Sequence, residues 1–313
     1  MKDRTSGHNE YIQASADFNK ARNRALISKV YNMMNSQKDD LLSFHDVKEI
    51  LKPKNQLYLG MKTVPIKLIV GSEGRYRDFN KYFLPRSEFL RHRWERVDRA
   101  QLEDVPLPAI QLYEIGGAYF VRDGNHRVSV ARSRGIEEID AEVISLSSEI
   151  TITSPMTTDD LKKAVIDLEK KIFYEKTSFL EITGEKDLNF TTTGRYDKIY
   201  EQILERQYIM NQENGKEIQF QEAVFSWYNE IYRPIIKTIK HHKLDNNFPG
   251  KSPADIYLSI VRHWDFLKRK HGEDYSLQAA ARNYSHRYGN RRGNNTGFFG
   301  KLAGFFGNRT INK

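Results

Sequence analysis

An anion-binding turn is predicted at Asp123-Gly124-Asn125-His126-Arg127, where an apolar strand runs directly into a helix. Gly124 permits a tight turn between the two elements because it has no Cβ to clash. The first N–H groups of a helix have no partner within it, and Arg127 adds a cation with forked donors beside them. These residue types predict a phosphate site at Gly124–Arg127. The alternative is an ordinary turn that caps the helix, with His126 and Arg127 in solvent.

Strands and one helix are expected around this turn. The apolar patterns and turn residues predict a short strand followed by a turn at Thr63–Ile69 and strands at Ala109–Tyr113, Ala118–Arg122 and Ile139–Ser145. They also predict a helix at Arg86–Leu102 and a hairpin turn at Gly116-Gly117. Helical spacing predicts further helices at Ala16–Asn35, Phe44–Leu51, Thr158–Glu175, Arg195–Gln212 and Gln219–His242, and one that begins at Ser252-Pro253. The chain is therefore expected to combine one mixed sheet with a largely helical region.

The element order, with a strand that ends in G-x-[HR]-R at a helix start, resembles the ParB/sulfiredoxin superfamily over roughly residues 60–147. The resemblance implies a phosphate-binding turn formed by Gly124, Asn125, His126 and Arg127. Sulfiredoxins place a catalytic cysteine where this chain has Asn125, and the chain has no cysteine, so sulfinic-acid reduction by that route is excluded. ParB-type partition proteins carry G-E-R-R at this turn and hold a nucleotide triphosphate there, which implies that His126 and Arg127 take the places of the two arginines.

The turn is also similar to D-G-H-H-R, the motif of free-serine kinases that share this fold and use a nucleoside diphosphate as donor. Those enzymes carry a glutamate shortly after the first strand, near the substrate hydroxyl. Glu73 lies at a comparable place here, so the resemblance implies Glu73 as general base. In a kinase, either Glu73 or Asp123 would activate the acceptor hydroxyl. The alternative is that Glu73 is only a loop carboxylate between Gly71 and Gly74.

The same loop supplies two further cations, Arg75 and Arg77, on either side of Tyr76. Forked guanidinium donors in a loop that follows a strand are suited to close on phosphates or on a nucleic-acid backbone. The alternative is a pair of solvated arginines. We expect both residues to belong to the nucleotide site.

Positive charge is concentrated at the C-terminal end of the chain. The formal net charge is +9 in 313 residues, and no acidic residue follows Tyr275. A basic tail of this kind is typical of binding to nucleic acid or anionic surfaces, although it can also be a solvated tail. The predicted nucleic-acid contacts are Arg282, Arg287, Arg291 and Arg292. The role of the segment GFFGKLAGFFG at Gly297–Gly307 stays open.

The expected fold class is α+β, a ParB/sulfiredoxin-like mixed-sheet domain flanked by N-terminal helices and a mostly α-helical C-terminal domain. The expected divisions are an N-terminal helical segment at 1–55, a nucleotide-binding domain at 56–150, a helical domain at 151–289 and a basic tail at 290–313. Most of residues 20–290 resembles bacterial proteins that join a ParB-like domain to a helical extension and are labelled ParB-like nucleases or transcriptional regulators. Aromatic residues of the helical region have helical spacing, which favours core packing over base stacking: Trp227, Tyr228, Tyr232, Tyr257, Trp264 and Phe266.

We therefore expect a nucleotide-dependent binding protein with a regulatory role on nucleic acid. Its ligand would be a nucleoside di- or triphosphate, with or without magnesium, and its partners nucleic acid and a second copy of the chain. The alternative is a small-molecule kinase of the amino-acid type. The histidines show no metal-ligand spacing, so no metal site is predicted. No apolar run approaches 18 residues, and MKDRTSGHNE does not have the pattern of a signal peptide, so a cytoplasmic protein is expected.

Overall fold

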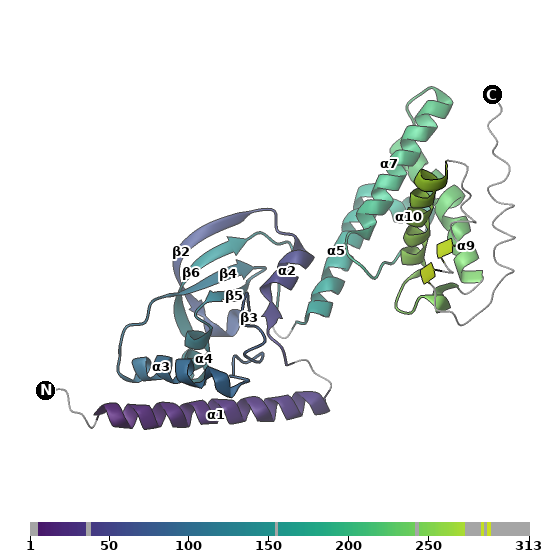
Figure 1. Cartoon of the computed structure of the whole chain (residues 1–313). Coiled ribbons are helices and arrows are strands. Elements are labelled where there is room, and N and C mark those ends of the chain that lie inside the picture. The colour runs from purple at the N-terminus through teal and green to yellow at the C-terminus, as the bar shows by residue number, and fades with distance from the viewer. Residues whose placement is uncertain are drawn as a thin grey trace. The chain divides into compact units, whose positions relative to one another are not determined.

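The chain divides into two compact units, Met1–Ala164 and Val165–Lys313. The computed structural model describes residues 6–35, 39–153, 156–241, 244–272, 283–284 and 287–288. Figure 1 shows a sheet with helices in the first unit and a group of helices among the described residues of the second. No helix in these described ranges is long and apolar enough to cross a membrane.

A six-stranded mixed sheet forms the first unit, with the strand order β1-β3-β5-β4-β6-β2. The strands are β1 (Leu42–Ser43), β2 (Gln56–Pro65), β3 (Ile69–Ser72), β4 (Ile110–Ile115), β5 (Ala118–Asp123) and β6 (Glu138–Leu146). β5 lies inside the sheet, parallel to β3 and antiparallel to β4. The mixed sheet confirms the α+β class, and it places the end of β5, where the predicted phosphate turn lies, between two neighbouring strands.

Helices α3 and α4 pack together beside the sheet, and α1 runs along them (Figure 1). The helices of this unit are α1 (Ser6–Met34), α2 (Phe44–Leu51), α3 (Arg91–Leu102) and α4 (Asn125–Ser133). Buried Trp94 of α3 joins them, because its Nε1 donates a hydrogen bond to Ser129 Oγ of α4 at 2.9 Å and its ring meets Phe18 of α1 edge-on at 5.6 Å between centroids. These contacts fix the middle of α4 and helix α1 against α3.

Several predicted elements of this unit are confirmed and others are wrong in their limits. Helix α2 has the predicted bounds, and Ser43 Oγ caps it by accepting a hydrogen bond from the Asp46 N–H. The short strand and turn predicted at Thr63–Ile69 are confirmed, since β2 ends at Pro65 and a 3-10 turn covers Ile66–Leu68; β2 begins earlier, at Gln56, and β3 begins at Ile69. The Ile66 N–H donates to the Glu137 carbonyl at 2.8 Å, so a distant loop determines where the chain turns.

Two predicted helices also begin elsewhere. α1 begins ten residues before the predicted Ala16, and α3 begins at Arg91 instead of Arg86. Ser87 Oγ accepts a hydrogen bond from the Phe89 N–H and starts a short 3-10 turn, Glu88–Leu90, ahead of α3. Residues 42–43 of the expected helical segment 1–55 form β1 and pair with β3.

The second unit is helical in its described residues. Its elements are α5 (Thr158–Thr177, which begins in the first unit), α6 (Phe179–Thr183), α7 (Arg195–Asn214), α8 (Phe220–Ser226), a π-helical segment (Trp227–Tyr232), α9 (Arg233–His241), a 3-10 turn (Leu244–Asn247) and α10 (Pro253–His271). The helix predicted over Gln219–His242 is interrupted by the π segment, and Pro234, which cannot donate an N–H, is the second residue of α9, which follows that segment. The predicted start of α10 is confirmed by a capping box between Ser252 and Asp255.

Aromatic side chains form the core of this unit. Trp227, Tyr228, Tyr232 and Tyr257 are buried and Trp264 is partly buried, which confirms their prediction as core residues. Phe266 is an exception, because 55% of it is exposed.

Candidate phosphate-binding hollow

The predicted turn brings β5 into α4 through Gly124, whose φ is +109°. A side chain here would be strained by this backbone angle, and its Cβ would lie 2.4 Å from Ile110 Cγ2. Glycine is therefore required for two independent reasons. The result is a helix whose first residue, Asn125, follows the strand almost at once.

The N-terminus of α4 is not capped by a side chain. Its N-cap residue is Gly124, no side chain accepts a hydrogen bond from the first turn, and that turn carries no acidic residue. The first helical hydrogen bond runs from the Val128 N–H to the Gly124 carbonyl at 3.0 Å. The N–H groups of Asn125, His126 and Arg127 thus precede the helical ladder, and the helix dipole favours an anion beside them.

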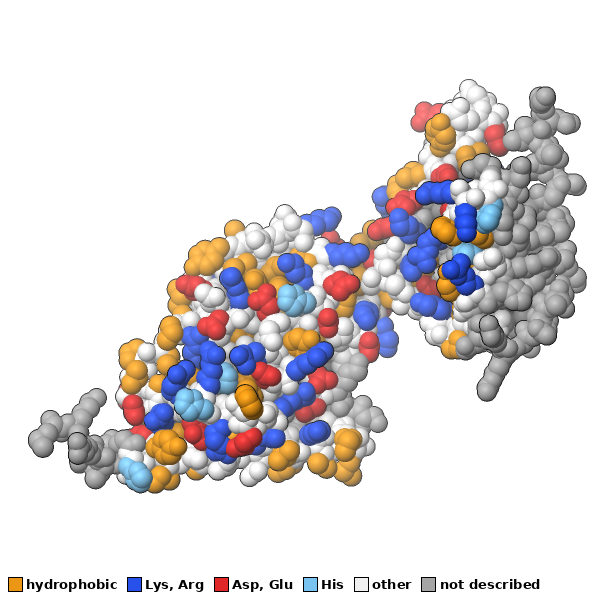
Figure 2. All heavy atoms as spheres, in the orientation of Figure 1, with side chains coloured by type: hydrophobic (Ala, Val, Ile, Leu, Met, Phe, Trp, Pro, Cys, Tyr) orange, Lys and Arg blue, Asp and Glu red, His pale blue; other side chains and the backbone are white. Residues whose placement is uncertain are grey.

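A hollow of about 420 Å³ opens at this helix end. Four of its lining residues are arginines, against two aspartates: Arg75, Arg93, Arg122 and Arg127, with Asp78 and Asp123. Figure 2 shows lysine and arginine side chains, with histidines among them, over the part of the first unit where Figure 1 labels α3 and α4. The arrangement is chemically suited to a small, multiply charged anion.

His126 contributes a neutral ring to this hollow. Burial, and to a smaller extent the nearby Arg93 and Arg75 cations, lowers the pKa of its imidazole to about 4. The ring is 5% exposed and packs edge-on against Phe79 at 5.4 Å between centroids. His126 therefore acts at neutral pH as a hydrogen-bonding group and not as the cation that an arginine would supply at this position.

Two buried polar atoms of the motif have no hydrogen-bond partner among the described residues. They are the Asn125 amide oxygen and His126 Nδ1, and both residues line the hollow. Asn125 is 6% exposed, so water reaches it poorly. Buried polar groups are nearly always paired in folded proteins. Their pairing requirement points to a ligand or ordered water in the hollow.

Arg127 is already engaged by the protein. Its guanidinium donates to the carbonyls of Pro108 and Ala109, the latter at 3.0 Å, and to Asp123 Oδ2 at 2.5 Å. These bonds tie the loop before β4 to the start of α4. The structure thus gives Arg127 and Asp123 a positioning role, and their predicted contacts with phosphate or substrate stay predictions.

The loop after β3 divides its predicted site residues between two places. Arg75 lines the hollow, where it forms a 2.9 Å ion pair with Asp78. Arg77 lines a second, larger cavity of about 1590 Å³, and its guanidinium lies 5.5 Å from the Tyr76 ring centroid. The described lining of the hollow includes Gly74 but not Glu73, whose N–H donates to the Val121 carbonyl at 2.9 Å.

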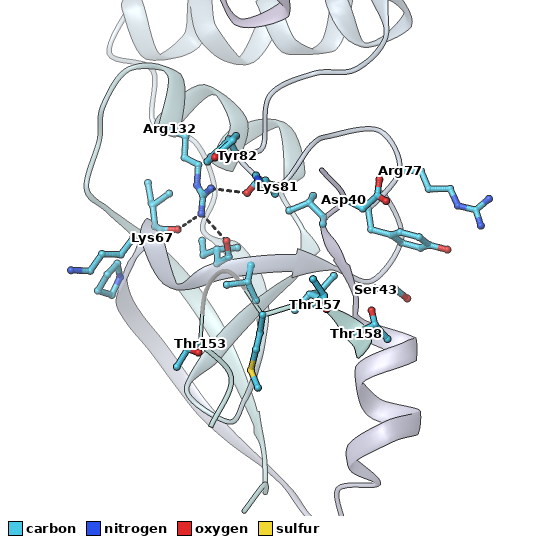
Figure 3. A pocket seen from close by; sticks show the side chains of 18 of the residues that line it. Asp40, Ser43, Lys67, Arg77, Lys81, Tyr82, Arg132, Thr153, Thr157 and Thr158 are labelled. Atoms are coloured by element: carbon cyan, nitrogen blue, oxygen red, sulfur yellow. Dashed lines mark hydrogen bonds between the residues drawn. The ribbon is translucent and has the colours of Figure 1, made fainter. Parts of the chain in front are cut away.

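The second cavity has a different character. Figure 3 shows Arg132 donating hydrogen bonds to the carbonyls of Ile66, Ile69 and Lys81, at 2.8, 2.7 and 3.4 Å. The Arg77 side chain extends away from Arg132. Burial lowers the pKa of Arg132 to about 10. Its guanidinium holds the turn between β2 and β3, so this cation supports the fold.

Two of the arginines that line the hollow were not predicted, Arg93 of α3 and Arg122 of β5. Arg93 stands next to buried Trp94, and helical spacing marks it as exposed, but nothing local indicates that α3 packs beside α4. Arg122 precedes the motif directly and is exposed. Its position next to the motif is the one feature of the sequence that indicates a place for Arg122 in the hollow.

The predicted nucleic-acid contacts fall mainly outside the described residues. Arg282, Arg291 and Arg292 lie there, and only Arg287 is described, with its guanidinium 5.7 Å from the Tyr288 ring centroid. Within the described ranges, no group of three or more His, Cys, Asp or Glu side chains is placed to hold a metal ion.

Comparison with known proteins leaves the family assignment as a prediction. No family model matches the chain, and no curated protein matches it. Two solved structures, a C2221 form of a Pnob8-like ParB-N domain and a pNOB8-like ParB N-domain, are 13% and 14% identical to it. They cover 80% and 83% of this chain, and 99% and 94% of their own. Their TM-scores of 0.20 and 0.19 are too low to establish a shared fold.

Proposed function

We propose that this chain binds a phosphorylated nucleotide, a nucleoside di- or triphosphate, in the hollow at the start of α4. One observation carries the proposal: an uncapped helix N-terminus and the unpartnered Nδ1 of buried His126 open into one hollow lined by four arginines. Each part alone has a structural explanation. Together they leave donors and positive charge directed at one place.

The roles of the residues follow from their chemistry. Phosphate oxygens accept hydrogen bonds from the first N–H groups of α4, while Arg75, Arg93 and Arg122 neutralise their charge. The neutral ring of His126 donates or accepts a hydrogen bond according to its tautomer. Where magnesium accompanies the nucleotide, its ligands are phosphate oxygens, water and the carboxylate of Asp123, whose side chain is 60% exposed.

The wider role that we propose is regulatory and associated with nucleic acid. It is supported by the resemblance of the DGNHR turn to ParB-type proteins and by the excess of cations after Tyr275. The kinase alternative uses the same donor site. It receives no separate support from the described residues, because Glu73 is not among those that line the hollow.

A thermal-shift screen tests the binding. Nucleoside mono-, di- and triphosphates are added with and without magnesium, and the unphosphorylated nucleosides serve as controls. A ligand that binds only the folded state, at a concentration of 100 times its Kd, raises the free energy of unfolding by about 2.7 kcal/mol. This corresponds to a rise in Tm of about 5–10 °C. We expect the di- or triphosphates to produce this rise and the nucleosides to produce none. Equal Tm shifts with the nucleotides and the unphosphorylated nucleosides would refute the proposal.

A further inference from the structure

Phe89 is the most exposed large apolar side chain among the described residues, with 97% of its surface open to solvent. It lies in the 3-10 turn Glu88–Leu90 that leads into α3. Single exposed apolar residues are common on proteins and need no explanation by themselves. Phe89 differs because its backbone is held in place and because a cationic surface that leads to the hollow begins beside it.

The backbone of Phe89 is held on both sides. The Phe89 N–H donates a hydrogen bond to Ser87 Oγ at 3.2 Å, and the next residue, Leu90, is buried in the core of the first unit. Arg91 joins the turn to α1, because its Nη2 donates to Asn19 Oδ1 at 2.6 Å. The ring of Phe89 therefore extends into solvent from a backbone that is already positioned, so less freedom is lost when a ligand covers it.

The exposed face of α3 connects Phe89 with the hollow. His92, Arg93 and Arg96 follow Phe89 by three, four and seven residues, so they lie on the same side of the helix, and all three are exposed. Arg93 and, one turn later, Val97 line the hollow. A rise of 1.5 Å per residue places Phe89 about 6 Å from Arg93 along the helix. The ribose of a nucleotide separates its base from its phosphates by a comparable length.

We propose that the base of the bound nucleotide stacks on the ring of Phe89 while its phosphates occupy the hollow. This inference rests on the proposed function and adds the site of the base to it. Every base has a π-face that can cover an aromatic ring, and cations beside such a ring hold the phosphates of the same ligand. The acidic neighbour of Phe89, Glu88, does not oppose them as a free charge, because it forms an ion pair with Arg91.

Isothermal titration calorimetry of the full chain tests the stacking with two ligands. One is the nucleoside triphosphate that stabilises the chain most, and the other is inorganic tripolyphosphate, which has the phosphates but no base. We expect Phe89→Ala to raise the Kd of the nucleotide at least about fivefold and to change that of tripolyphosphate by less than about twofold. The matched control is Phe225→Ala on α8, a phenylalanine that is 56% exposed, which should change neither Kd by more than about twofold.

The results separate the stacking from the phosphate site. Arg75→Ala should weaken both ligands, because Arg75 lines the hollow. If Arg75→Ala does so and Phe89→Ala leaves the nucleotide Kd unchanged, or weakens both ligands equally, the stacking is overturned and binding in the hollow stands. If neither ligand binds the wild type, both proposals fail.

Two further substitutions distinguish an aromatic platform from a merely apolar one. Phe89→Trp should keep the nucleotide affinity, whereas Phe89→Leu should lose as much as Phe89→Ala, because leucine has no π-face. The introduced tryptophan also gives a signal of its own beside the three native tryptophans. Nucleotide should quench the fluorescence of Phe89→Trp more than that of the wild type, and tripolyphosphate should not. Equal quenching in the two proteins, or full affinity in Phe89→Leu, would overturn the stacking.

Discussion

Ile110 occupies the space that a side chain at position 124 would need, because a Cβ on Gly124 would lie 2.4 Å from Ile110 Cγ2. The turn into α4 therefore depends on a contact between the start of β4 and the end of β5. This contact gives the first prediction.

Gly124→Ala should lower the free energy of unfolding by about 2–4 kcal/mol, through backbone strain and overpacking together. Gly60→Ala is the control, since Gly60 also has a positive φ, +74°, but has open space around it. That substitution should cost only the strain, about 1–2 kcal/mol. Urea denaturation measures both. Equal losses would show that packing against Ile110 does not matter.

The buried ring of His126 predicts a pH dependence of stability. Its pKa is about 4 in the folded chain, compared with the ordinary value of 6.5. Between these values the unfolded state takes up a proton that the folded state does not, so stability falls as the pH is lowered from 6.5 to 4, by up to about 3 kcal/mol. The full contribution is present above pH 6.5.

Denaturation from pH 4 to 7 should therefore show a smaller slope in His126→Gln than in the wild type. The NMR titration of the ring gives a second readout, because a bound phosphate places negative charge beside it and should raise its pKa. A His126 pKa that stays near 6.5 in the free protein would contradict the burial argument.

Nucleic-acid binding by the basic tail should depend steeply on salt. Deleting residues 290–313 removes Arg291, Arg292, Lys301, Arg309 and Lys313. If these cations contact phosphates, the slope of log K against log salt becomes shallower in the truncated chain, because fewer counterions are released. Mobility shifts at several salt concentrations measure the slope. Identical slopes for the two chains would refute a role of the tail.

Glu73 separates the binding protein from the kinase. As a general base it would be needed for product formation, whereas a loop carboxylate should change nucleotide affinity by no more than about threefold. The wild type is incubated with nucleotide and a pool of amino acids and sugars, and mass spectrometry detects phosphorylated products. We expect no product. A donor-dependent product that disappears in Glu73→Gln would support the enzyme instead.

Local signals in the sequence predicted the elements that local interactions determine. Helix α2 has the bounds predicted from its sequence, and Ser43 caps it. The hairpin between β4 and β5 was predicted from the pair Gly116-Gly117, and both glycines adopt positive φ. The mixed sheet was also predicted. The turn within Thr63–Ile69 was predicted too, but the length of β2 was not, because its first residues, from Gln56 onward, are held in the sheet by pairing with the distant β6.

The composition of the hollow depends on packing between distant segments. The motif itself indicated Gly124–Arg127, but Arg93 reaches the hollow only because Trp94 fixes α3 against Ser129 of α4. Likewise, Arg75 and Arg77 are equivalent in sequence and yet line different cavities. No pattern within the loop distinguishes them.

This difference between Arg75 and Arg77 gives the most direct test of the proposed nucleotide site. Arg127 is less suitable, because its substitution would also release the carbonyls of Pro108 and Ala109. Isothermal titration calorimetry compares the wild type, Arg75→Ala and Arg77→Ala with the nucleotide that stabilises the chain most. We predict that Arg75→Ala raises the Kd about tenfold, about 1.4 kcal/mol, and that Arg77→Ala changes it by less than about twofold. An unchanged Kd in Arg75→Ala, or an equal loss in both variants, would contradict binding in the hollow.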